Sequence, residues 1–133
     1  MELIKITPDK KRAKSILNMV LLIEERIKNE NKVKFVSLII CDYYEIIKEL
    51  ITAILLIDGY KTLSHKDLID YLSENYKEFS EQEIDLIDNL RIFRNRISYE
   101  GFEIDKDYLA RNENSFMQII KKLKELVLRK IKG

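Results

Sequence analysis

The sequence predicts an all-α fold, an antiparallel four- to five-helix bundle. Three glycines and one proline in 133 residues are too few for the many turns of a β protein. Charged residues at 35% and hydrophobic residues at 46% are typical of packed helices with solvated outer faces. No Gly- and Ser-rich linker and no repeat interrupts the chain, so residues 1–133 are expected to form a single domain.

The first two helices carry clear boundary signals. At Thr7-Pro8 a capping hydroxyl precedes a proline suited to the first helical position, and the helix that follows is expected to end near Asn29. A longer helix is predicted over Val33–Asp58, with Gly59 as its C-cap because glycine adopts the left-handed conformation cheaply. Apolar residues lie on two sides of this second helix, which predicts a central place in the bundle.

Polar caps mark the next two helices. Ser64 is expected to cap a short helix over residues 65–75, with Asp67 completing a weak capping box. Ser80 and Glu83 form a clearer capping box for a helix over residues 81–99.

The last helix is expected after an interruption at Gly101. Asp105 can cap this helix, which is predicted to run to about Lys132. Because the connections between the long helices are short, we expect neighbouring helices to be antiparallel.

Charge and cysteine content exclude several classes of protein. The formal net charge is +1, which argues against a protein that grips duplex DNA by bulk charge. Net charge is about +4 over residues 1–34, −8 over 42–90 and +5 over 111–133. The two basic ends are interpreted as basic rims or, in preference, as ordinary solvated faces.

The lone Cys41 and lone His65 exclude an intramolecular disulfide, a Cys-based zinc cluster and a two-His metal site within one chain. We therefore expect no metal and no cofactor. The sequence shows no export signal and no apolar run near the ~20 residues that a membrane span needs, so we expect a cytoplasmic protein that does not contact membranes.

One short segment carries the chemistry. Arg91, Asn95 and Tyr99 fall on one flank of the fourth predicted helix, since each residue advances about 100° around a helix. Arg94 lies on a neighbouring flank. Arginine beside asparagine favours directed hydrogen bonding to phosphate or carboxylate. The alternative is local ion pairing, which applies to the flanking arginines more than to Arg94, with these acids as partners: Glu81, Asp85, Asp88 and Glu100.

Arg94-Asn95, followed by Tyr99, Gly101 and an aromatic residue, resembles the signature motif of HEPN domains. These helical bundles carry an Arg, usually a polar residue next, and a His about five positions after the Arg. The upstream sequence agrees with the family's central helix and the start of its next helix, and these segments carry the agreement: Asp42-Tyr43-Tyr44, residues 50–57, Gly59 and Ser64-His65-Lys66-Asp67-Leu68. The resemblance covers roughly residues 35–125.

The resemblance implies a homodimer whose motif helices face each other across a cleft, with RNA or a nucleotide as ligand. Many HEPN domains are metal-independent ribonucleases. Many act in toxin–antitoxin pairs with a minimal nucleotidyltransferase, and some act in defence systems. Carried over to this chain, Arg94 would bind phosphate and stabilise the transition state, Asn95 would position the ligand, and Arg91 and Tyr99 would complete the ligand-binding set.

The chain departs from the family at the catalytic histidine, whose position holds Tyr99. Imidazole titrates near ~6.5 and phenol near ~10, so tyrosine is a poor general base at pH 7. We therefore favour a HEPN-like domain that binds RNA or nucleotide, or docks a nucleotidyltransferase partner, without strong catalytic activity. A metal-independent endoribonuclease toxin that uses Arg94 and Tyr99 is the first alternative. A purely structural helical interaction module is the second.

Other reactive residues have simpler interpretations. His65 is the only alternative imidazole, and a structural role packing the short helix onto the long one is favoured over a catalytic role. Cys41 is expected to be a small core residue rather than a nucleophile. Tyr43 and Tyr44 are expected to form core and cleft wall in preference to a base-stacking platform.

Overall fold

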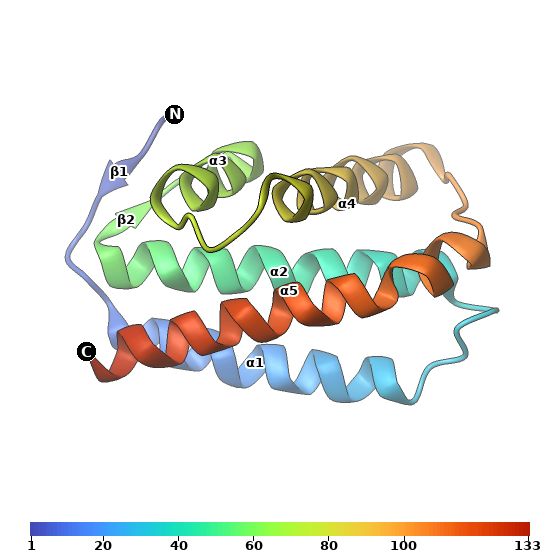
Figure 1. Ribbon diagram of the computed structural model, residues 1–133, viewed down its shortest axis with the longest axis horizontal. Coiled ribbons are helices and arrows are strands. Elements are labelled where there is room, and N and C mark those ends of the chain that lie inside the picture. The colour runs from blue at the N-terminus through green and yellow to red at the C-terminus, as the bar shows by residue number, and fades with distance from the viewer.

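Five helices and one small sheet make up the computed structural model, which describes residues 1–133 (Figure 1). The predicted all-α bundle is confirmed, with the addition of a two-stranded antiparallel sheet. The long helices alternate in direction along the chain (Figure 1). The elements, in order, are β1 (Ile4–Lys5), α1 (Lys10–Lys28), α2 (Val36–Asp58), β2 (Tyr60–Lys61), α3 (His65–Asn75), α4 (Glu81–Glu100) and α5 (Lys106–Lys132).

Helix α2 occupies the centre of the bundle, as its two apolar sides predicted. Thirteen of its 23 residues are buried, and it packs against α1, α3, α4 and α5. Each fully buried Leu or Ile contributes roughly 1.5–3 kcal/mol relative to an exposed one, so this helix carries the largest share of the core. No helix has an apolar stretch long enough to cross a bilayer.

Most of the predicted caps are confirmed. Ser80 Oγ accepts from Glu83 N at 3.1 Å and Glu83 Oε1 accepts from Ser80 N at 2.9 Å, which completes the capping box of α4. Gly59 ends α2 in the left-handed conformation, with φ of 90°. Asp105 caps α5 by accepting from Asp107 N at 2.9 Å.

The capping box predicted for α3 is only half formed. Ser64 Oγ accepts from Asp67 N at 3.2 Å, as expected. The Asp67 carboxylate does not return the bond, because it accepts instead from the backbone N–H of Glu2 at 3.0 Å. Ser64 N donates to Thr62 Oγ1 at 3.2 Å.

The predicted start of α1 at Thr7-Pro8 is wrong, since the N-cap is Asp9, whose side chain accepts from Arg12 N at 2.9 Å. Residues 4–9 run alongside the end of α2 instead. Ile6 N donates to Gly59 O, and Asp9 N to Leu56 O, both at 2.9 Å. These bonds join segments about fifty residues apart, so the local sequence signal did not reveal them.

The predicted start of α2 at Val33 is also wrong, because the helix begins three residues later, at Val36. Asn31 Oδ1 accepts from the N–H groups of Val33 and Lys34, at 3.0 and 2.9 Å, and holds them in a turn. An Asn side chain that bonds backbone a few residues on competes with helix formation in this way. Phe35 becomes an N-cap without a side-chain cap bond.

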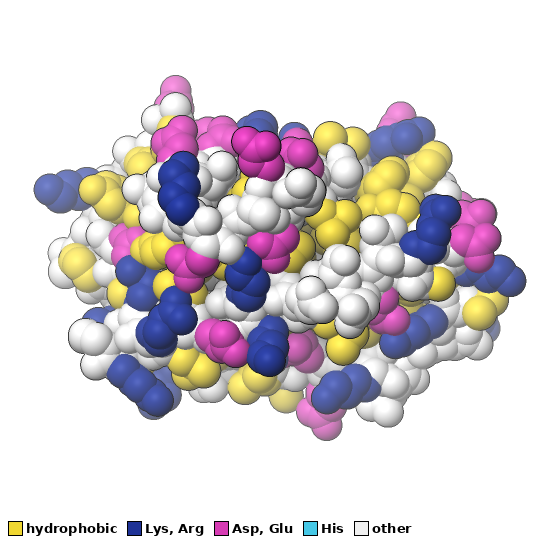
Figure 2. Space-filling model, viewed as in Figure 1, with side chains coloured by type: hydrophobic (Ala, Val, Ile, Leu, Met, Phe, Trp, Pro, Cys, Tyr) yellow, Lys and Arg dark blue, Asp and Glu magenta, His cyan; other side chains and the backbone are white.

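The outer faces carry mixed charge, and Figure 2 shows Lys and Arg side chains interspersed with Asp and Glu. The basic C-terminal segment does not form a uniformly basic rim, because four of its cations pair with acids elsewhere in the chain. Their contacts are Lys122–Glu83 at 2.8 Å, Lys124–Glu24 at 2.9 Å, Arg129–Glu78 at 3.0 Å and Lys130–Asp58 at 2.6 Å.

Candidate functional site

Helix α4 positions the motif residues over the central helix. The capping box fixes the start of α4, and buried Ile87 and Leu90 anchor its middle in the core. The motif begins at the next residue, Arg91. Arg94 follows Leu90 by four residues, so it lies on the same side of α4 as these anchors, toward α2. Arg91 and Asn95 lie along the edge of that side, and Tyr99 points outward.

The three arginines of this segment differ in what they contact. Arg91 Nε lies 2.8 Å from Asp88 Oδ1. Arg96 Nε lies 3.4 Å from Glu100 Oε2, and its guanidinium stands 3.8 Å from the centroid of the Phe102 ring.

Arg94 makes no ion pair. Its only side-chain hydrogen bond is a long one, from Nη1 to Asn95 Oδ1 at 3.4 Å, although its side chain is half-buried. A guanidinium has five N–H donors, so most of its capacity is unused. Arg94 is therefore the motif cation that is free to take an anionic ligand.

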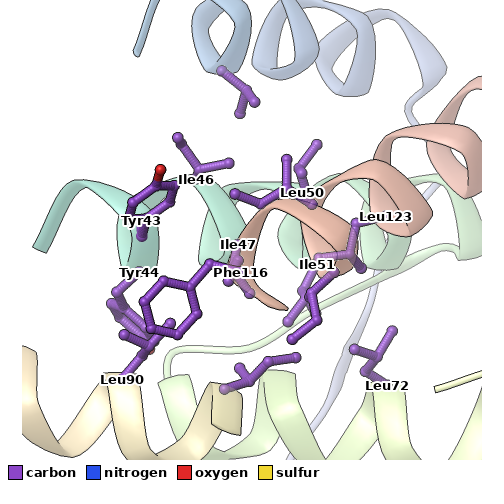
Figure 3. Packing of buried hydrophobic residues seen from close by; sticks show 14 of the residues in the cluster. Tyr43, Tyr44, Ile46, Ile47, Leu50, Ile51, Leu72, Leu90, Phe116 and Leu123 are labelled. Atoms are coloured by element: carbon purple, nitrogen blue, oxygen red, sulfur yellow. The ribbon is translucent and has the colours of Figure 1, made fainter. Parts of the chain in front are cut away.

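Arg94 lies close to Tyr44, a residue of α2. Figure 3 shows the two tyrosines of α2 diverging: Tyr44 points toward α4, where Leu90 is labelled, and Tyr43 points away from it. The Tyr44 hydroxyl is buried and has no hydrogen-bond partner. Burial raises the pKa of Tyr44 to about 12, while the positive charges of Arg91 and Arg94 oppose the rise.

His65 also lies in this neighbourhood. It is the first residue of α3, and its ring centroid is 6.0 Å from that of Tyr44. Burial, followed by the positive charges of Lys48 and Arg94, lowers the pKa of His65 below 6.5. The imidazole is therefore neutral at pH 7 and can both donate and accept a hydrogen bond. The packing of His65 onto α2 agrees with its expected structural role.

The approach of His65 to Arg94 was missed in the sequence, because the two residues come from different helices. One signal could have suggested the neighbourhood. On α2, Glu45 and Lys48 follow Cys41 at helical spacing, which places polar and charged side chains together beside the buried face of that helix.

Cys41 and Tyr43 have no reactive environment. Cys41 is half-buried rather than fully in the core, and burial raises the pKa of its thiol, with Arg94 opposing, so the thiol stays protonated at neutral pH. Tyr43 is buried and donates from its hydroxyl to Glu113 Oε2 at 2.7 Å. Tyr43 and Tyr44 are thus core residues, as expected, and neither offers a face for base stacking.

Asn95 and Tyr99 lie farther out on α4. Asn95 is half-buried and accepts the bond from Arg94. Tyr99 is 80% exposed in the last turn and forms no hydrogen bond or aromatic pair. Five residues separate Arg94 from Tyr99, which places them about 140° apart around the helix. The two side chains do not converge within one protomer.

None of the pockets of the molecule is lined by the four predicted site residues. The largest has a volume of about 350 Å³ and begins one turn further along α4, at Ile97 and Gly101. No group of three or more His, Cys, Asp and Glu side chains is arranged to hold a metal ion.

Comparison with models of protein families, with curated proteins and with solved structures found no match for the chain. The geometry around Arg94 and the motif resemblance therefore carry the functional inference.

Proposed function

We propose that the protein is a HEPN-like domain that forms a homodimer and binds RNA or a nucleotide through Arg94. Arg91, Asn95 and Tyr99 complete the proposed ligand-binding set. The observation that carries the proposal is that Arg94 alone of the three neighbouring arginines has no carboxylate partner, although it is half-buried. A cation kept partly out of water without a partner favours a ligand that brings negative charge.

Phosphate suits this environment. The planar guanidinium can bond two phosphate oxygens at once. The neutral imidazole of His65 lies nearby and adds a hydrogen-bond donor without a second fixed charge. In a homodimer with facing motif helices, the exposed ring of Tyr99 would lie at the junction of the two protomers, where it could stack on a base.

The proposed biological setting is a toxin–antitoxin or defence-type system with a minimal nucleotidyltransferase partner. This part rests on the motif resemblance. The outward face of α4 offers a surface for such a partner, because Ile92 and Tyr99 leave apolar area exposed beside Asn95. The proposed dimer uses the same face, so docking of such a partner would compete with dimer formation.

Replacing Arg94 tests the proposal. Arg94→Ala should weaken binding of a single-stranded oligoribonucleotide by about 10- to 100-fold, since a charge-assisted hydrogen bond contributes roughly 1.5–3 kcal/mol. The thermal midpoint should stay nearly unchanged, because Arg94 makes no ion pair. The matched control is Arg111→Ala, which removes an exposed arginine of α5. Equal losses in the two variants, or a large fall in thermal midpoint for Arg94→Ala, would contradict the proposal.

The position of His65 beside Arg94 favours one alternative, a metal-independent ribonuclease. In that case the purified protein should cut single-stranded RNA in the presence of a chelator, and Arg94→Ala should abolish the cutting. Tyr99→His restores the family's residue, and a gain of cleavage in that variant would show that the unmodified chain lacks only a proton-transferring group. If the protein neither binds nor cuts RNA, a structural interaction module is the better description.

A further inference from the structure

The largest pocket of the molecule lies at the end of the bundle where α2 begins and α4 ends (Figure 1). Its volume of about 350 Å³ is within the range of about 300–1,000 Å³ that is usual for small-molecule sites. Seven of its 11 lining residues are hydrophobic, among them Phe35, Leu38, Ile97 and Phe102. Leu38 is 60% exposed, so the pocket leaves apolar surface in contact with water.

Hydrogen bonds and ring packing within the chain hold the walls of this pocket in place. The N–H of Ile104 donates to Ser37 Oγ at 3.0 Å, which ties the loop after α4 to the first turn of α2. Phe102 N donates to Arg96 O at 3.3 Å. The Phe102 ring lies parallel to that of Phe93, with 6.4 Å between centroids. The pocket is therefore preformed.

The pocket lies near Arg94 along α4, although Arg94 does not line it. Ile97 follows Arg94 by three residues on α4, which is about 4.5 Å along the helix axis and 60° around it. On α2, Leu38 precedes Cys41 by the same spacing, and the charge of Arg94 is felt at the Cys41 thiol. One molecule could therefore touch both the guanidinium and the pocket.

The rim of the pocket is polar and carries both signs of charge. Lys34 and Glu103 are exposed there and form no ion pair, so one can donate to and the other can accept from the edge of a ligand. The guanidinium of Arg96 covers Phe102 at 3.8 Å, and stacked guanidinium groups are common neighbours of nucleobases. Figure 2 shows hydrophobic side chains gathered over the end of α4, with Lys and Arg beside them.

We propose that this pocket receives the base of a nucleotide whose phosphate is bound by Arg94. The inference rests on the proposed function and adds a second subsite to it. Apolar and aromatic residues cover the faces of the base, and Lys34 and Glu103 meet its edge. A simple acyl chain would make no polar contact with either charged group, whereas a nucleobase carries both donors and acceptors on its edge.

Two probes that share a phosphate separate the two subsites: 5′-AMP, and ribose 5-phosphate, which has no base. In titration calorimetry, 5′-AMP should bind about tenfold more tightly than ribose 5-phosphate, because stacking of a base contributes that much or more. Leu38→Gln should weaken 5′-AMP about threefold to tenfold and leave ribose 5-phosphate unchanged. Arg94→Ala should weaken both probes.

The matched control is Leu63→Gln, because Leu63 is 91% exposed and lies outside this pocket. It should bind both probes as the unmodified protein does. As a direct readout, the NMR signals of Phe102 should shift with 5′-AMP and not with ribose 5-phosphate. Equal binding of the two probes would overturn the pocket proposal and leave the phosphate site standing. Failure to bind either probe would overturn both.

Discussion

His65 reports on the arrangement of side chains around Arg94. It is the only histidine of the chain, so its titration gives a single, unambiguous NMR signal. The charged groups around it come from two helices: Lys48 and Glu45 from α2, and Arg91 and Arg94 from α4. Burial and the three cations lower its pKa, and Glu45 alone opposes them.

Removing one of these cations should therefore change the pKa of His65. We expect the pKa of His65 to lie below 6.5, and Arg94→Ala to raise it toward 6.5, because a repulsive charge is lost. Arg111→Ala, on α5, should leave the pKa unchanged. An unshifted titration in Arg94→Ala would show that the two side chains are not neighbours.

The same lowered pKa has a consequence for stability. The unfolded chain takes up the proton near pH 6.5, before the folded chain does, so the free energy of unfolding falls as the pH drops below about 6.5. Above that pH His65 is neutral in both states and contributes no pH dependence. His65→Gln should flatten this part of the pH profile measured by urea denaturation.

Individual side chains were predicted unevenly from the sequence. The burial of Tyr43 and Tyr44 followed from their place on an apolar helix. The ion pairs of Arg91 and Arg96 could be predicted, because each joins the arginine to an acid three or four residues away on the same helix. The meeting of Arg94, Tyr44 and His65 depends on how three helices pack, which no local spacing encodes.

At the scale of the elements, local signals placed most helix boundaries. Caps such as Ser80 and Asp105 act within three residues, so their sequence pattern is sufficient. The two wrongly predicted helix starts, at Thr7-Pro8 and at Val33, have another cause. Backbone bonds from Ile6 and Asp9 to the end of α2 hold the first segment, and the Asn31 side chain holds the second in a turn.

The two glycines that end helices should differ in how well they tolerate a side chain. Both have positive φ, 90° at Gly59 and 65° at Gly101. A Cβ at Gly59 would lie 3.1 Å from Ile6 O, whereas a Cβ at Gly101 would meet nothing within 4 Å. Each alanine variant should lose about 1–2 kcal/mol from the left-handed conformation alone.

Gly59→Ala should lose more than Gly101→Ala, because Ile6 must also move and its hydrogen bond to Gly59 O is strained. Urea denaturation of the two variants measures the difference. Equal losses in the free energy of unfolding would contradict this prediction. They would mean that the backbone from Ile6 to Asp9 can shift away from the new methyl group at no measurable cost.

Across the whole molecule, the uneven charge of the sequence is compensated by folding. The acidic middle of the chain supplies Asp58, which lies within 2.6 Å of Lys130 Nζ and also accepts from the hydroxyls of Tyr71 and Tyr76. This cluster joins the end of α2 to α3 and α5. The net charges of the three segments were evident in the sequence. Only the packing of the helices shows that the opposite charges lie next to each other.

The proposed homodimer is a feature of the whole molecule, and the proposed role of Tyr99 depends on it. The outward face of α4 carries Ile92, which is 43% exposed, and Tyr99 seven residues later, so the two lie on nearly the same line along the helix. If the motif helices face each other, both side chains are buried between protomers, and a buried charge there is costly.

Ile92→Glu should therefore convert a dimer into a monomer in sedimentation analysis, with a mass near the 15.9 kDa of one chain. The control is Met19→Glu on α1, which introduces the same charge at a methionine that is 57% exposed. That variant should remain dimeric. Because Ile92 lies outside the core, Ile92→Glu should also keep the helical content of the unmodified protein, so a monomer would not be a product of unfolding. A monomeric wild-type protein, or dissociation by Met19→Glu alone, would contradict the proposal that the motif helices face each other and that Tyr99 lies between the protomers.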